Sequence, residues 1–153
     1  MSARPTVSAL EDHLGYWLRF VSNHVSHAFS LKVAALDVTV AEWVVLRELF
    51  DADAQPPSLL AGQIGMTRGA ISKLADRLIA KGLVARTAST QDRRYQTLAL
   101  TGSGRALVPK LSALADRNDK EFFGHLSPAT RRTIERALRE IVHERGLKTI
   151  PTE

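Results

Sequence analysis

The chain of 153 residues contains no cysteine. A disulfide framework, a thiolate metal site and a thiol-based redox switch are therefore excluded. No stretch offers about 18 uninterrupted apolar residues, and the first residues, MSARPTVSALEDH, lack the apolar core of a secretion signal. We therefore expect a soluble, cytoplasmic protein without a membrane-spanning helix.

The sequence also lacks the motifs of common enzymes. It has no glycine-rich phosphate loop, no convincing nucleophile motif and no evident pair of carboxylates. We therefore expect a protein that is not an enzyme and that needs no cofactor. Apolar residues, in contrast, make up 44% of the chain, which is enough for the core of one compact fold.

Positive charge is concentrated in one segment. Residues 58–101 carry seven basic and two acidic side chains, and the rest of the chain is balanced, so this segment holds the whole net charge of +5. A local basic excess between neutral flanks is typical of a nucleic-acid-binding surface. An ordinary solvated basic face remains the alternative.

Residues 8–36 are predicted to form one long helix, because apolar side chains recur there at three- and four-residue steps. One stripe comprises Leu10, Leu14, Leu18, Val21, Val25 and Ala28. A second stripe comprises His13, Trp17, Phe20, His24, His27 and Leu31. The core of a monomer can bury one stripe, so we expect the other to face a partner subunit or a small-molecule cavity.

The next helix is predicted to begin at Thr39, whose hydroxyl forms a capping box with Glu42, three residues later. The loop DADAQPP ends this helix. Its predicted apolar face comprises Trp43, Val44, Leu46, Leu49 and Phe50.

A helix-turn-helix follows. Ser58 is expected to cap a short helix that stops at Gly65, and Thr67 to cap a second helix over 68–81 that ends in a left-handed Gly82. The apolar face of the second helix comprises Ile71, Leu74, Ala75, Leu78 and Ile79. Its opposite face presents Gly69, Ser72, Lys73, Asp76, Arg77 and Ala80.

Two strands, 83–87 and 95–100, are predicted to form a hairpin with a polar, charged tip. Helices over 102–124, capped by Thr101, and from Ser127–Pro128 to Gly146 complete the chain. The expected fold is therefore mainly α with a small β-hairpin wing: a winged helix-turn-helix with long helices at both ends.

In this layout the second helix of the helix-turn-helix can enter a major groove of double-stranded DNA. Small residues allow close approach, helix-start N–H groups suit a phosphate, and Lys73 and Arg77 can reach guanine or phosphate. Asp76 can accept a hydrogen bond from cytosine or orient a neighbouring arginine. The predicted DNA contacts are Ser58, Thr67, Arg68, Gly69, Ala70, Ser72, Lys73, Arg77, Asp92, Arg93 and Arg94.

The segments DVTVAEWVVLREL, LLAGQIGMTRGAISKLADRLIAKGLVAR and QDRRYQTLALTGSGRAL resemble the MarR family of transcription regulators, over nearly the whole chain. The resemblance implies a homodimer on a pseudo-palindromic operator, with dimerisation helices in 1–37 and 102–153 and a DNA-binding domain in 38–101. It implies that Arg94 enters the minor groove and that Asp92 holds the wing. Ser89 stands where the family often has a further acidic residue.

The same resemblance implies a repressor that small ligands, often aromatic acids, release from DNA. The candidate ligand-binding residues are His13, Trp17, Trp43 and Arg47, because rings beside a cation suit an aromatic carboxylate. As the alternative, both tryptophans are core residues and Arg47 is merely exposed.

Two questions stay open at this point. His24 and His27 lie three residues apart and could share a metal, but two ligands do not make a site, so packing or dimer-interface roles are favoured and no metal is expected. The alternative function is a winged helix that contacts proteins without sequence-specific DNA binding. Such a module would not need the basic excess of 58–101.

Overall fold

A computed structural model of the protein describes residues 4–88 and 96–148. Within these ranges the chain is mainly helical with an antiparallel hairpin, which confirms the predicted fold class. No helix there combines the length and the apolar composition that a bilayer-spanning segment needs. In chain order the elements are the 3-10 helix η1 (Leu10–Asp12), α1 (Leu14–Ala34), α2 (Val40–Phe50), α3 (Pro57–Ile64), α4 (Arg68–Ala80), β1 (Val84–Ala88), β2 (Gln96–Leu100), α5 (Gly102–Phe123) and α6 (Pro128–Glu144).

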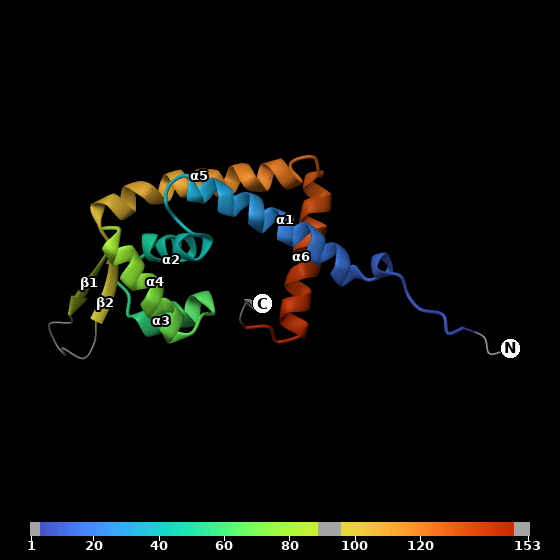
Figure 1. The fold of residues 1–153 in the computed structure, drawn as a ribbon, viewed down its shortest axis with the longest axis horizontal. Coiled ribbons are helices and arrows are strands. Elements are labelled where there is room, and N and C mark those ends of the chain that lie inside the picture. Colours follow the sequence, from blue (N-terminus) through green and yellow to red (C-terminus); the bar gives the residue numbers. More distant parts are fainter. Residues whose placement is uncertain (1–3, 89–95, 149–153) are drawn as a thin grey trace.

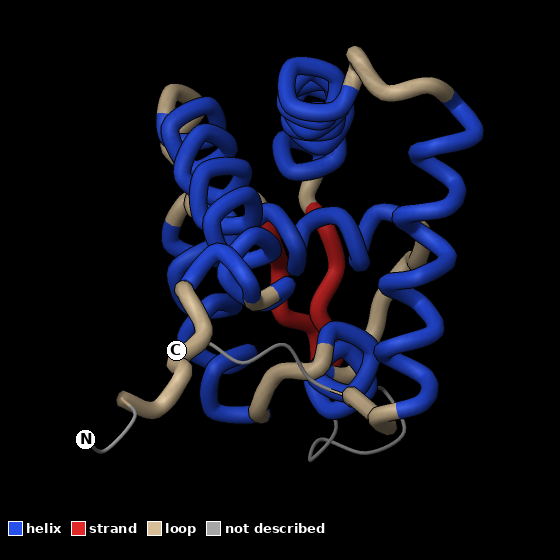
Figure 2. Tube along the Cα trace, turned by 90° about the vertical axis from the view of Figure 1, so that its right-hand side faces the viewer, coloured by secondary structure: helices blue, strands red, loops and turns tan. Residues whose placement is uncertain are grey.

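The long helix α5 connects two parts of the molecule. At its first end it meets the hairpin and the group of α2, α3 and α4, whereas α1 runs beside it and α6 turns away from its far end (Figure 1). Figure 2 shows α5 nearly end-on, with α1 and α6 on opposite sides of it.

The first helix is shorter than the predicted range 8–36. The Asp12 carboxylate accepts a hydrogen bond from the Ala9 N–H (2.8 Å) and closes η1, after which His13 is extended (φ −99°, ψ 125°) and separates η1 from α1. At the other end, Asp37 takes a left-handed backbone conformation (φ 58°) and turns the chain toward α2. Local turns at both ends therefore make the helix shorter than the range predicted from the apolar periodicity.

The predicted capping box begins α2. The Thr39 N–H donates to the Glu42 carboxylate (3.0 Å), and the Glu42 N–H donates to the Thr39 hydroxyl (3.1 Å). The predicted apolar face is only partly right, because α3, α4, α5 and β2 all pack on this helix. The buried residues are Glu42, Val45, Leu46 and Leu49, whereas Trp43, Val44 and Phe50 are half-buried.

The predicted start of α3 was wrong. Pro56 is the residue before the helix and Pro57 is its first residue, so Ser58 lies inside the first turn and does not cap it. Proline suits the first helical position, since its fixed φ is already helical and its missing N–H has no partner there. The helix ends as predicted at Gly65, which is left-handed (φ 76°).

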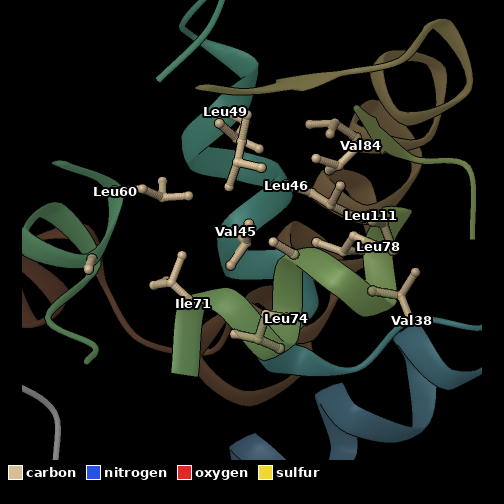
Figure 3. Packing of buried hydrophobic residues seen from close by; sticks show 14 of the residues in the cluster. Val38, Val45, Leu46, Leu49, Leu60, Ile71, Leu74, Leu78, Val84 and Leu111 are labelled. Carbon is tan, nitrogen blue, oxygen red and sulfur yellow. The ribbon is translucent and has the colours of Figure 1, made fainter. Parts of the chain in front are cut away.

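The start and the inner face of α4 are as predicted. The Thr67 hydroxyl accepts a hydrogen bond from the Ala70 N–H (3.1 Å) and caps the helix. Side chains of α4 and α2 point toward each other and form the centre of the core (Figure 3). The buried residues of α4 are Ile71, Leu74, Ala75 and Leu78.

The end of α4 has the predicted left-handed glycine. Gly82 has φ 73°, and its N–H donates to the Ile79 carbonyl (2.9 Å), while the Leu83 N–H donates to the Leu78 carbonyl (3.0 Å). These two bonds define a Schellman motif, which turns the chain from the helix into the hairpin.

The junction between α4 and α5 is tightly bonded. The Thr101 hydroxyl donates to the Gly82 carbonyl (2.7 Å) and accepts from the Gly104 N–H (3.1 Å), and the Thr101 N–H donates to the Leu83 carbonyl (3.0 Å). A Cβ at Gly104 would overlap the Leu83 carbonyl oxygen, so only glycine permits this approach. The end of α4 is therefore fixed directly to the start of α5.

The hairpin strands β1 and β2 pair antiparallel from Val84 opposite Leu100 to Ala88 opposite Gln96. The loop before α3 adds to this sheet, because Gln55 and Leu98 exchange two backbone hydrogen bonds (2.9 and 2.8 Å). The hairpin tip, 89–95, lies outside the described residues. β1 starts and ends one residue later than predicted, and β2 ends at Leu100 as expected, whereas its predicted first residue, 95, lies outside the described residues.

Polar contacts hold α1 against α5. The Lys32 ammonium lies 2.8 Å from the Glu121 carboxylate and donates to the buried Asn118 side chain (3.0 Å). The amide of Asn118 donates in turn to the Val25 carbonyl (3.2 Å). These contacts lie in the second half of α1, so among the described residues they hold that half, and not the first, against α5.

The first half of α1 and the whole of α6 present apolar faces that the described protomer does not cover. Neither stripe of α1 is buried there, contrary to the expectation that the monomer core buries one of them. α6 has no buried residue, and its apolar face lines a groove of about 770 Å³. The exposed apolar residues include Leu14, Trp17, Leu18, Phe20 and Val21 on α1 and Ile134, Leu138, Ile141 and Val142 on α6.

Candidate nucleic-acid interface

The solvent face of α4 carries the predicted contacts in its first turns. Gly69, Ser72 and Lys73 are exposed, and a Cβ at Gly69 would meet no protein atom within 4 Å. The packing of the protein therefore does not require glycine at this position. The missing side chain instead leaves room for another molecule to approach the helix backbone.

The first N–H groups of α4 are available to an anion. Thr67 caps the N–H of Ala70, whereas the N–H groups of Arg68 and Gly69 have no intrahelical acceptor, as in the first turn of any α-helix. The helix dipole adds partial positive charge at this end, and Arg68 adds a full charge. A phosphate oxygen is the kind of ligand that such a helix start binds.

Arg77 is not simply extended into solvent. Its guanidinium donates to the Thr39 hydroxyl (3.3 Å) and lies 3.6 Å from the Glu42 carboxylate, although 53% of its side chain is exposed. Lys81, one turn further, donates to the Asp37 carbonyl (2.6 Å) and contacts the Glu42 carboxylate at 3.0 Å. Both basic residues at the end of α4 thus turn toward the start of α2.

Glu42 is the functional candidate that sequence reasoning missed. The capping box identified its bond to Thr39 but gave no sign that the side chain would be fully buried. Burial tends to raise the pKa of the Glu42 carboxyl, but hydrogen bonds from the Thr39 N–H and from Lys81 outweigh burial and lower the pKa below its usual value. The carboxylate is therefore a buried negative charge between α2 and α4.

Asp76 contacts an arginine rather than standing alone. Its carboxylate accepts from the Arg86 guanidinium of β1 (3.0 Å). Of the two roles considered for Asp76, orientation of a neighbouring arginine is the one present in this structure. The contact joins the solvent face of α4 to the base of the hairpin.

The remaining predicted DNA contacts are distributed as follows. Ser58 is exposed in the first turn of α3. Asp92, Arg93 and Arg94, together with Ser89, fall in 89–95, outside the described residues. Their predicted role in the wing therefore stays a prediction.

The four candidate ligand-binding residues do not form one site within a protomer. Trp43 packs edge-on against Phe29 in the second half of α1 (centroids 6.4 Å apart), and Arg47 pairs with Asp51 (2.8 Å). His13 and Trp17 lie at the other end of α1, and Trp17 is about 18 Å from Phe29 along the helix axis. Trp43 is half-buried against the core, as the alternative interpretation of both tryptophans as core residues predicts, whereas Trp17 is 49% exposed.

The two histidines on α1 belong to no metal-binding cluster in the part of the chain that the structure describes. Both His24 and His27 are exposed, and the His24 ring stacks on Phe20 (centroids 5.2 Å apart). No group of three or more histidine, aspartate or glutamate side chains in the described ranges could hold a metal ion. Burial in the protomer is therefore not the role of these histidines.

Comparison with known proteins agrees with this geometry. The family model described as the MarR family matches residues 38–95, from the start of α2 to the hairpin. The HTH-type transcriptional repressor Rv2887 of Mycobacterium tuberculosis is 29% identical over 84% of this chain and 92% of its own length. The chain spans only 58% of the length of another relative, the Escherichia coli regulator PrsX.

Solved structures match over almost the whole described protomer. A mutant of Escherichia coli MarR in complex with operator DNA matches with a TM-score of 0.77 at 25% identity, over 84% of this chain and 93% of its own. Bordetella bronchiseptica BpsR, whose DNA binding is regulated by 6-hydroxynicotinic acid, matches with a TM-score of 0.79 at 27% identity, over 89% of this chain and 97% of its own.

These relatives are transcriptional regulators rather than enzymes, which agrees with the prediction made from the missing catalytic motifs. The match to the family model covers the helix-turn-helix, and the structural matches extend the likeness to the long helices at both ends. The resemblance found in the sequence is thereby confirmed: residues 38–95 match the model of the MarR family, and the relatives named above are transcriptional regulators.

Proposed function

We propose that the protein is a homodimeric repressor that binds double-stranded DNA and that a small molecule releases it. The observation that carries the proposal is the solvent face of α4, where small residues, a lysine and open helix-start N–H groups lie together. The operator complex of Escherichia coli MarR supports this use of the fold.

The dimensions of α4 fit a major groove. Its 13 residues span about 20 Å, and a major groove about 12 Å wide accepts one helix. We propose that Ser72 and Lys73 face base edges, that Arg68 and the helix start face a phosphate, and that Gly69 and Ala70 permit the close approach. Ser58, Thr67 and the wing residues Asp92, Arg93 and Arg94 complete the proposed interface.

The uncovered apolar faces support a dimer. We propose that residues 1–37 and 102–153 supply the dimerisation helices, and that 38–101 form the DNA-binding domain. Two copies related by a two-fold axis would present two α4 helices to neighbouring major grooves, about 34–36 Å apart on one side of the duplex. The operator would then be pseudo-palindromic.

DNA binding is tested with a salt series on duplexes drawn from a fragment library of the source genome. We expect affinity for a selected duplex to fall steeply as salt rises, because the basic segment releases counterions from phosphates. Lys73→Ala should weaken binding by about 1–3 kcal/mol. Lys120→Ala, an equal change of charge at an exposed position near the far end of α5, is the matched control and should bind like the parent protein.

Two results would contradict the DNA proposal. One is undetectable binding to every duplex in the library. The other is an affinity that salt does not change, which would favour a module that contacts proteins.

Ligand release is tested with aromatic carboxylic acids, starting from 6-hydroxynicotinic acid, the regulator of BpsR. We expect an active acid to lower DNA affinity and to change tryptophan fluorescence, since the chain has two tryptophans. In Trp17→Phe and Trp43→Phe variants, the tryptophan that still responds identifies the end of α1 near which the acid binds. An acid that releases DNA in both variants without any fluorescence change would remove both tryptophans from the proposed ligand site.

A further inference from the structure

We infer that Glu42 is a positioning residue for DNA binding, which holds Arg77 at a fixed place where its exposed edge meets a DNA phosphate. The inference rests on the proposed DNA binding and adds a role for a residue that cannot touch DNA itself. Glu42 is fully buried, whereas Arg77 is half-exposed on the same side of α4 as Lys73.

The contacts of Glu42 exceed what a helix cap requires. A capping box needs one side-chain oxygen to accept from the backbone N–H of Thr39, and glutamine serves as well as glutamate. The carboxylate also contacts Lys81 through both oxygens (3.1 and 3.0 Å) and lies 3.6 Å from Arg77. A buried carboxylate costs free energy unless cations compensate it, and here two cations four residues apart do so.

Arg77 is held on one side and open on the other. One terminal nitrogen bonds the Thr39 hydroxyl and faces Glu42, while 53% of the side chain stays exposed. A guanidinium has five N–H donors in a rigid plane, so donors remain for a second acceptor. Because its position is already fixed, the side chain loses less rotamer entropy when that acceptor binds.

The second acceptor is a phosphate rather than a base. Arg77 lies in the last turn of α4 and is tied to the start of α2, so it cannot turn freely toward the groove floor near Gly69 and Ser72. Lys81 also ties the end of α4 to the start of α2, because it donates to the carbonyl of Asp37 in the turn from α1 into α2. A contact to phosphate positions the protein and carries no sequence information.

The positioning of Arg77 and simple electrostatics predict opposite changes in DNA affinity for Glu42→Gln. Removal of a negative charge near the interface should strengthen DNA binding if only net charge matters. If Glu42 positions Arg77, the same change should weaken binding about tenfold, since a released Arg77 loses its fixed phosphate contact. The capping box remains in the glutamine variant, so the start of α2 is kept.

The experiment compares four variants of the 153-residue protein on a selected duplex and on an unrelated one. Arg77→Gln should weaken binding to both duplexes by a similar factor. It should also make the plot of log affinity against log salt concentration less steep, by about 0.9 in slope, because one phosphate contact is lost. Glu42→Gln should also weaken binding to both duplexes. The double variant should bind no more weakly than Arg77→Gln alone. Glu48→Gln, the same change at an exposed position of α2, is the matched control and should not weaken binding.

A second test does not depend on a buried substitution. Arg77→Lys keeps the charge at the surface but loses the planar fork that contacts Thr39 and Glu42 together. We expect this variant to lose about tenfold in affinity on both duplexes, as a positioned guanidinium requires. It also decides the question if circular dichroism shows that Glu42→Gln does not fold.

Three results would overturn the inference: DNA binding by Glu42→Gln as tight as that of the parent protein or tighter, full affinity in Arg77→Lys, or additive losses in the double variant. Failure of the proposed function looks different, because the parent protein itself would then bind no duplex in the salt series.

Discussion

A Leu138→Asp substitution on α6 should convert the proposed dimer into a folded monomer with a mass of 16.8 kDa. Leu138 is 42% exposed in the protomer, and α6 has no buried residue, so the protomer itself does not need this side chain. In a dimer the residue would lie in an apolar contact, where an unpaired carboxylate costs several kcal/mol. Light scattering after gel filtration measures the mass.

DNA binding should fail together with the dimer. Two linked α4 helices bind one operator far more tightly than a single helix, since the second contact is intramolecular. Arg136→Asp, on the polar face of the same helix, is the matched control and should leave the mass and the DNA affinity unchanged. A Leu138→Asp protein that remains dimeric would show that α6 is not part of the dimer contact.

A Leu78→Ala substitution should lower the free energy of unfolding by about 2–5 kcal/mol, the usual range for a buried leucine replaced by alanine. Leu78 is completely buried on the inner face of α4, opposite α2, and its carbonyl also accepts the hydrogen bond of the Schellman motif (Figure 3). The alanine would keep that backbone bond and leave a cavity in the core. The loss is therefore one of packing rather than of the helix end.

Urea unfolding at one fixed protein concentration measures this effect, because the stability of a dimer depends on concentration. Leu59→Ala on α3 is the control: Leu59 is 51% exposed, and the same change should cost about 0.5 kcal/mol or less. A Leu78→Ala protein as stable as the parent would mean that the inner and outer faces of α4 were assigned wrongly.

Local signals predicted α4, the proposed DNA-binding helix, well. Thr67 and Gly82 set its ends because a hydroxyl cap and a left-handed glycine act through their own backbone neighbours. Spacing then separated the buried face from the exposed one, which the burial of Leu78 and the exposure of Lys73 confirm. The start of α3 was missed for an equally local reason, since Pro57 took the first helical position and left Ser58 inside the helix.

Side-chain partners from distant segments were not predictable in the same way. The contact of Asp76 with Arg86 spans ten residues, and that of Glu42 with Lys81 spans 39. Periodicity assigns a residue to a face but does not say which polar group from another element reaches it. The separation of Trp17 from Trp43 was missed because the sequence does not show where along α1 the neighbouring helix packs.

The sequence alone determined the order of the helices, the exposed face of α4, the concentration of positive charge in 58–101 and the resemblance to the MarR family, because caps, periodicity and motif spacing are properties of neighbouring residues. The tertiary structure decided that Glu42 is a buried charge, that Arg77 is held by it, and that the first half of α1 and all of α6 stay uncovered in the protomer. Burial and ion pairing depend on which segments meet in space, and only the packing of α2, α4 and α5 brings those segments together.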